Sequence, residues 1–225
     1  AVKTAAAIAP FVSKLTYRCV VRDELASGVA FQPFDVDAAV MFVDISGYSR
    51  MAAALAPQGA HALAEVVNAY FSLILDTVAQ HGGDIMKFAG DAVMIAWTLK
   101  TAARSAERAC RCALALQASC GRHDVVVGSG DKLTLRMHIG ITFGLLKTSV
   151  LRPRQAATPV MPRAFYNVGG PTLHEIGAVL DAAKPGEVCV SKRVASLCDD
   201  ASPFVFSART ADDGSDILLM ESRAM

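Results

Sequence analysis

An apolar run that ends on a single carboxylate is the sequence feature that most restricts the fold of this chain. Residues 39–43 are Ala-Val-Met-Phe-Val, and Asp44 follows them directly. Such a run is typical of a buried β-strand, which would place Asp44 at the strand's end. Ser46, Gly47 and Tyr48 come next, and their backbone N–H groups can open a helix and receive an oxyanion. The alternative is that Asp44 only caps the following helix.

A second acid has a similar setting. Residues 81–97 predict a strand, a tight turn and a strand, with Asp91 at the tip of the hairpin. A Gly-Asp turn alone is more often structural than functional. However, a carboxylate beside an anion site repels an anionic ligand unless a cation lies between them, which favours Mg²⁺ or Mn²⁺. Asp44 and Asp91 together predict a clamp for two ions about 3.5–4 Å apart.

Segments 42–48 (Phe-Val-Asp-Ile-Ser-Gly-Tyr) and 87–92 (Lys-Phe-Ala-Gly-Asp-Ala) resemble the signature pair of class III nucleotidyl cyclases. The greatest similarity is to the first catalytic half of soluble, bicarbonate-responsive adenylyl cyclases. The resemblance implies an α/β (α+β) domain, ferredoxin-like βααββαβ with extra C-terminal strands, which works as a dimer with ATP or GTP bound across the interface. It also implies that Asp44, the Ile45 carbonyl and Asp91 bind two Mg²⁺ or Mn²⁺ ions, and that residues 46–48 bind phosphate. Residues 1–35 would be a lead-in segment packed on the core, and residues 36–225 the cyclase homology domain.

A rival interpretation concerns Gly82-Gly83-Asp84, which is similar to the loop of diguanylate cyclases. That loop would continue with Glu-Phe. Here Ile85 and Met86 follow. The class III pattern therefore fits the sequence better.

The chain departs from the family where a helix is expected over residues 172–183. In the family's homodimers this helix supplies an asparagine and, four residues later, an arginine that stabilise the transition state. The corresponding positions here are Thr172 and Ile176. A guanidinium delivers fixed positive charge to oxygens that gain negative charge, and isoleucine delivers none. The base-reading pair is also incomplete, because Lys87 matches one member and Phe165 stands near the other.

This asymmetry predicts the metal-binding half of a heterodimeric cyclase, in which a second cyclase-type domain brings the missing groups. One ion would help to deprotonate the ribose 3′-hydroxyl for in-line attack on the α-phosphorus, and the other would neutralise the triphosphate. The similarity to soluble adenylyl cyclases favours ATP as the substrate, with cyclic AMP and pyrophosphate as products. Lys87, Phe165, Thr172 and Ile176 would form a degenerate second site, and without the arginine we expect weak or absent bicarbonate activation. The alternative is a catalytically silent dimerisation or scaffold domain.

Composition limits the other functions open to the chain. With 225 residues, 53% of them hydrophobic, it can form one sizeable core. A net charge of +1 gives no strong electrostatic attraction for nucleic acid. The apolar runs fall short of the roughly 18 residues of a membrane span, and no signal-peptide pattern is seen. The six cysteines lack zinc spacing and are expected to be reduced thiols in the cytoplasm. His138 is expected to be an ordinary strand residue.

Overall fold

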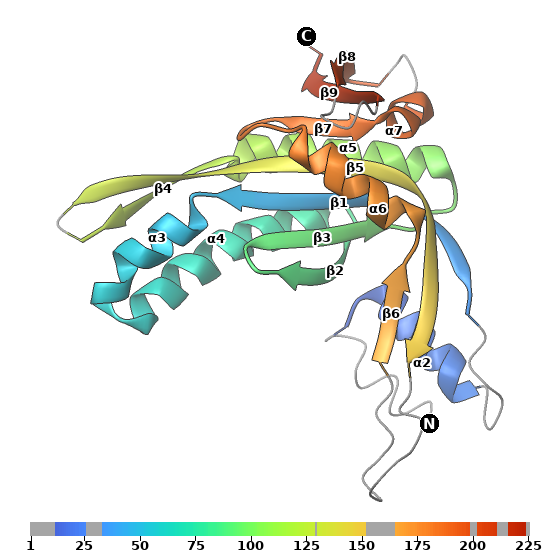
Figure 1. Ribbon diagram of the computed structural model, residues 1–225, viewed down its shortest axis with the longest axis horizontal. Coiled ribbons are helices and arrows are strands. Elements are labelled where there is room, and N and C mark those ends of the chain that lie inside the picture. Colours follow the sequence, from blue (N-terminus) through green and yellow to red (C-terminus); the bar gives the residue numbers. More distant parts are fainter. Residues whose placement is uncertain are drawn as a thin grey trace, which may run out of the picture.

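The computed structural model describes residues 12–25, 33–128, 130–151, 165–198, 202–210 and 216–223 (Figure 1). The helices are α2 (Lys14–Leu25), α3 (Tyr48–Leu55), the 3₁₀ turn η2 (Ala56–Gln58), α4 (Ala60–Gln80), α5 (Ala102–Cys120), α6 (Pro171–Asp181) and α7 (Lys192–Leu197). The strands are β1 (Asp35–Ser46), β2 (Asp84–Ala89), β3 (Ala92–Trp97), β4 (Arg122–Val127), β5 (Asp131–Leu151), β6 (Phe165–Gly169), β7 (Val188–Ser191), β8 (Phe204–Thr210) and β9 (Asp216–Ser222).

One mostly antiparallel sheet organises these elements, in the order β2-β3-β1-β5-β7-β9-β8. The pairing of β5 with β7 is parallel, while β4 and β6 pair with the two ends of the long strand β5. β1 lies between β3 and β5. The strand predicted to end on Asp44 is therefore inside the sheet, and the predicted α+β class with extra C-terminal strands is confirmed.

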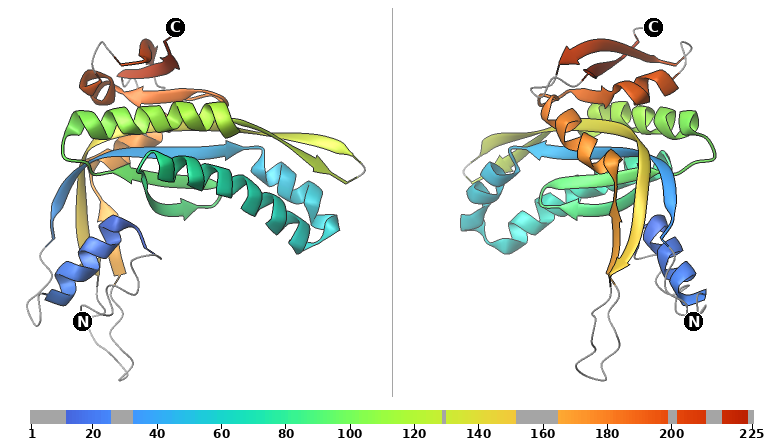
Figure 2. Two further views of the ribbon diagram at one scale, coloured as in Figure 1. Left: turned by 180° about the vertical axis from the view of Figure 1, so that it is seen from behind. Right: turned by 45° about the vertical axis from the view of Figure 1, so that its right-hand side comes forward.

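Helices cover both faces of the sheet. The alternating residues Met41, Val43 and Ile45 of β1 join the largest buried cluster with side chains from α4 and α5. Ala38 and Val40 point to the opposite face and form a second cluster, against which Leu173 of α6 packs. Figure 1 shows α6 crossing the front of β5 and β1, and the reverse view in Figure 2 shows α5 and α4 on the other side.

The helix α2 is attached to the sheet by a carboxylate that is distant in sequence. Asp84, at the start of β2, accepts hydrogen bonds from the backbone N–H groups of Lys14 (2.8 Å) and Leu15 (3.1 Å). These donors belong to the first turn of α2, where backbone N–H groups have no partner within the helix. Leu15 is also buried in the second cluster. The proposed boundary between residues 1–35 and 36–225 stays a prediction.

The helix α4 is only partly covered by the rest of the chain. Its buried side chains are Tyr70, Ile74 and Val78, whereas Leu73 is 44% exposed. Among the described residues, α4 is the helix whose length and composition would suffice to cross a membrane, although one or two such helices are weak evidence. The expected absence of a membrane span therefore stays a prediction.

Candidate active site

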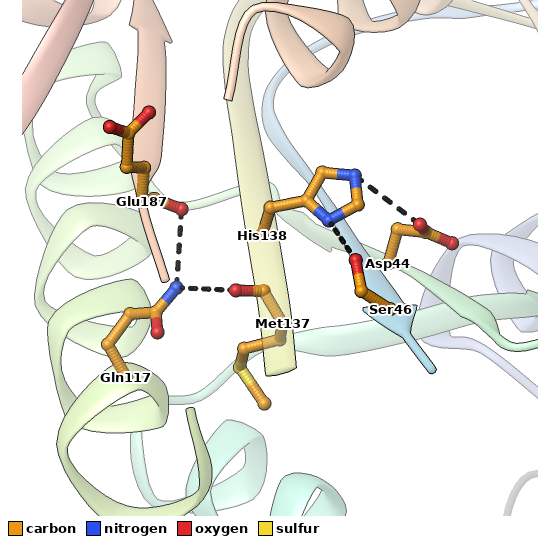
Figure 3. A network of polar contacts seen from close by, with 6 residues as sticks. All are labelled: Asp44, Ser46, Gln117, Met137, His138 and Glu187. Carbon is orange, nitrogen blue, oxygen red and sulfur yellow. Dashed lines mark hydrogen bonds and ion pairs between the residues drawn. The ribbon is translucent and has the colours of Figure 1, made fainter. Parts of the chain in front are cut away.

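Asp44 lies near the end of β1, directly opposite His138 of β5 in the antiparallel register. Its Oδ2 atom lies 3.3 Å from Nε2 of His138, and the side chains of Asp44 and His138 are 31% and 16% exposed. Nδ1 of the same imidazole lies 3.4 Å from Oγ of Ser46 (Figure 3). The carboxylate is thus held by a neighbour and is still open to solvent, as a ligand-binding group must be.

Asp91 lies in the two-residue turn between β2 and β3. Ala89 pairs with Ala92 across this turn, and Gly90 adopts a φ of 68°, a left-handed conformation that favours glycine. β1 and β3 are paired as far as Val43 and Val93. Asp44 follows the first of these residues and Asp91 precedes the second by two positions, so both acids lie at the same end of adjacent strands.

The N-terminus of α3 lies at this end as well. Ser46 is the last residue of β1, and Gly47 is the N-cap of α3 with a φ of 96°. As a glycine, this N-cap residue has no side chain that could cap the helix. Backbone N–H groups in an uncapped first turn can receive oxyanion oxygens. The predicted phosphate-binding residues, Ser46, Gly47 and Tyr48, therefore follow Asp44 at a helix start with no side-chain cap.

The donor set suits a hard divalent cation. Asp44 and Asp91 supply carboxylate oxygens, and Ile45 lies between Asp44 and the helix start. Mg²⁺ is usually bound through one or two carboxylates, with water and substrate phosphates completing the octahedron. Within the described residues, no cluster of three or more His, Cys, Asp or Glu side chains offers a complete protein cage. The residues present thus fit divalent ions whose coordination is completed by water or by phosphate oxygens.

The residues of the predicted second site are spread over three elements. Lys87 is exposed on the edge strand β2, and Phe165 is 59% exposed at the start of β6. Thr172 and Ile176 are 2% and 5% exposed on α6. The hydroxyl of Thr172 donates to the carbonyl of Leu145, which ties this residue to the packing between helix and sheet.

The Gly82-Gly83-Asp84 segment has a structural explanation in this fold. A Cβ atom at Gly83 would lie 2.7–2.9 Å from side-chain atoms of Val78, Trp97 and Ile95, so this position has room only for glycine. Asp84 binds the N-terminus of α2. In this fold the segment therefore joins α4 to β2 and anchors the N-terminus of α2 to the sheet.

His138 is the neighbour that the sequence did not reveal. Its position in an alternating strand predicts only which face it occupies, and the partner on β1 depends on the register between strands far apart in sequence. Had the β1–β5 register been known, Asp44 and His138 would have emerged as a pair.

Fold and site together define a nucleotidyl cyclase catalytic domain. The family described as the adenylate and guanylate cyclase catalytic domain matches residues 29–212, and this chain belongs to it. The resemblance drawn from the two motifs is confirmed.

Curated relatives include adenylate cyclase type 10 of Oryctolagus cuniculus, 29% identical over 170 residues, which are 72% of this chain and 10% of the relative. Adenylate cyclase 1 of Rhizobium meliloti is 38% identical over 78 residues, which are 34% of this chain and 11% of the relative. The chain thus spans about a tenth of the length of these relatives.

Solved structures share the fold. The adenylyl cyclase CyaB from P. aeruginosa superposes with a TM-score of 0.67 at 21% identity, over 86% of this chain and 97% of that one. The guanylate cyclase domain of RhGC from Catenaria anguillulae, in complex with GTP, gives a TM-score of 0.65 at 14% identity, over 86% of this chain and 100% of that one.

Proposed function

We propose that this chain is the metal-binding half of a heterodimeric cyclase that converts ATP to cyclic AMP and pyrophosphate. The observation that carries the proposal is an asymmetry. Asp44 and Asp91 lie at one end of adjacent strands beside an uncapped helix start. Thr172 and Ile176, by contrast, are buried where the family's transition-state groups are expected. A complementary cyclase-type domain would supply those groups and the base pocket.

The residues of this chain would bind and orient the triphosphate end of the substrate. Asp44, the Ile45 carbonyl and Asp91 would hold two Mg²⁺ or Mn²⁺ ions, which when bound lower the pKa of the attacking hydroxyl and neutralise phosphate charge. The backbone N–H groups of residues 46–48 would bind the outer phosphates and fix the α-phosphorus for in-line attack. Lys87 would remain at the degenerate second site, with weak or absent bicarbonate activation.

The relatives named adenylate cyclase support ATP as the substrate, although one structural neighbour was solved with GTP. We also propose that the protein lies in the cytoplasm, by analogy with the soluble adenylyl cyclases that it resembles. A silent scaffold domain would share the substitutions at Thr172 and Ile176, but it has no need for both Asp44 and Asp91. The retention of both acids favours catalysis.

A mixing assay tests the proposal. The full chain is combined with cyclase-type domains that carry the asparagine and arginine, in Mn²⁺ and ATP, and cyclic AMP is measured. We expect activity only in a mixture, and a loss of roughly a hundredfold or more for Asp44→Asn and Asp91→Asn, because the ions contribute several kcal/mol. Asp216→Asn is the matched control, since this acid is 79% exposed and pairs with Lys192 on the C-terminal part of the sheet. Activity that survives both acid substitutions would refute the proposal.

A further inference from the structure

The side chain of His138 links two parts of the candidate site. Nε2 faces Oδ2 of Asp44 at 3.3 Å, and Nδ1 faces Oγ of Ser46 at 3.4 Å (Figure 3). One partner is a predicted metal ligand, and the other is the first residue of the predicted phosphate loop. A single ring therefore contacts both.

Chemistry fixes the direction of the first contact. An ionised carboxylate can only accept, so in any hydrogen bond between these two atoms Nε2 is the donor. This contact engages Oδ2, and among the described residues Asp44 has no second ion pair. Oδ1 makes no ion pair with a described residue and is therefore available to a cation.

The strand that carries His138 is itself fixed. Nε2 of Gln117 on α5 donates to the carbonyls of Met137 and Glu187, both at 3.2 Å (Figure 3). The carbonyl of Met137 also accepts from the N–H of Gly186 at 2.7 Å. These bonds anchor the residue next to His138 to a helix and to the loop before β7. An imidazole on such a strand can hold a carboxylate in one orientation.

We infer that His138 is a positioning residue, which orients the Asp44 carboxylate for the metal ion and links it to the start of the phosphate loop. This inference rests on the proposed function, since it concerns the same metal site. Groups that hydrogen-bond to a ligating carboxylate commonly change metal affinity by 10–100-fold when they are removed. His138 would act through Asp44, without touching the substrate.

Two amide substitutions separate the contacts of the ring. In His138→Gln the amide nitrogen can occupy the place of Nε2 and donate to Asp44, whereas in His138→Asn it can reach only the place of Nδ1. Mn²⁺ alone is titrated into the full chain, and free Mn²⁺ is measured by electron paramagnetic resonance. We expect His138→Asn to weaken Mn²⁺ binding by about 10–100-fold, and His138→Gln to restore it to within a few-fold. Thermal unfolding checks that both variants are folded.

Each outcome has a distinct meaning. Equal Mn²⁺ affinity in the wild-type chain and His138→Asn overturns the role of His138 and leaves the metal site intact. Equal losses in both variants overturn it too, because the ring would then act only by packing. If the wild-type chain binds no Mn²⁺, or Asp44→Asn binds it equally well, the metal site fails and the inference fails with it.

Discussion

Gly140 determines how closely α6 can approach the sheet. A Cβ atom at this position of β5 would lie 2.9 Å from the backbone nitrogen of Leu180 and 3.0 Å from its Cα. Backbone atoms cannot move aside as the end of a flexible side chain can. We expect Gly140→Ala to lower the free energy of unfolding by about 1–3 kcal/mol, as overpacking does, and urea denaturation measures this.

Gly177, on the helix α6 itself, is the matched control for Gly140. Nothing lies within 4 Å of a Cβ atom built there, and its φ is not positive. Alanine is favoured over glycine in a helix by about 1 kcal/mol, so Gly177→Ala should stabilise the protein by up to that amount. A loss of stability from both substitutions would show that the close approach at Gly140 is not the cause.

Glu187 gives the protein a pH-dependent contact at the loop before β7. Burial raises the pKa of its carboxyl, but the Lys184 N–H and the Arg209 guanidinium bind the charged form and hold the pKa below its usual range. A lowered folded-state pKa gives stability that is present above the unfolded value, about 4.3, and is lost as the pH falls through the folded value. We expect Glu187→Gln to cost about 1–2 kcal/mol at pH 7.

The difference in free energy of unfolding between wild type and Glu187→Gln should shrink as the pH falls through the lowered folded-state pKa and the wild-type carboxyl becomes protonated. Urea unfolding across this range measures it. Lys192→Gln is the control, because its ion pair with Asp216 is formed by side chains that are 75% and 79% exposed and should contribute little. If the two proteins differed in free energy of unfolding by the same amount at every pH, the charge of Glu187 would not be the source of the stabilisation.

At the scale of elements, α2 depends on a cap from another part of the chain. Asp84→Ala removes the acceptor for the Lys14 and Leu15 N–H groups. We expect a loss of about 1 kcal/mol, as for other N-cap deletions, and faster hydrogen exchange at the first amides of α2. Asp84→Asn keeps one acceptor oxygen and should lose less. Unchanged exchange in α2 would mean that the apolar contacts of Leu15 hold the helix without the cap.

The elements near the site could be predicted where local patterns determine them. β1 and the β2–β3 hairpin follow from apolar runs and a Gly-Asp turn, and the structure has both. Contacts between distant segments could not be predicted. The Asp44–His138 pair depends on register, and the cap from Asp84 crosses about 70 residues of sequence. The sequence predicts Thr172 and Ile176 as positions of a degenerate site, which stays a prediction, and their burial could not be predicted because it depends on how α6 packs.

At the scale of the whole molecule, exposed aromatic surface lies close to the candidate site. Phe88 on the edge strand β2 is 51% exposed. Its ring packs edge-on against that of Phe71, with 5.5 Å between the ring centroids. Phe88 lies three positions before Asp91 in the sequence. The proposed partner domain would approach the two acids at this end of the hairpin, and it would then cover Phe88.

We therefore expect Phe88→Ser to weaken association with the domain that restores activity by tenfold or more, since burial of an aromatic side chain contributes about 1.5–3 kcal/mol. Titration calorimetry of the two purified domains measures the affinity. Val205→Ser is the matched control, because Val205 is 43% exposed on β8, at the opposite edge of the sheet from β2. If both variants remain folded and bind the partner equally well, the partner approaches by another surface. If Val205→Ser alone weakens binding, the interface lies on the C-terminal strands. The proposed partner would then reach Asp44 and Asp91 from that side of the sheet and not across β2.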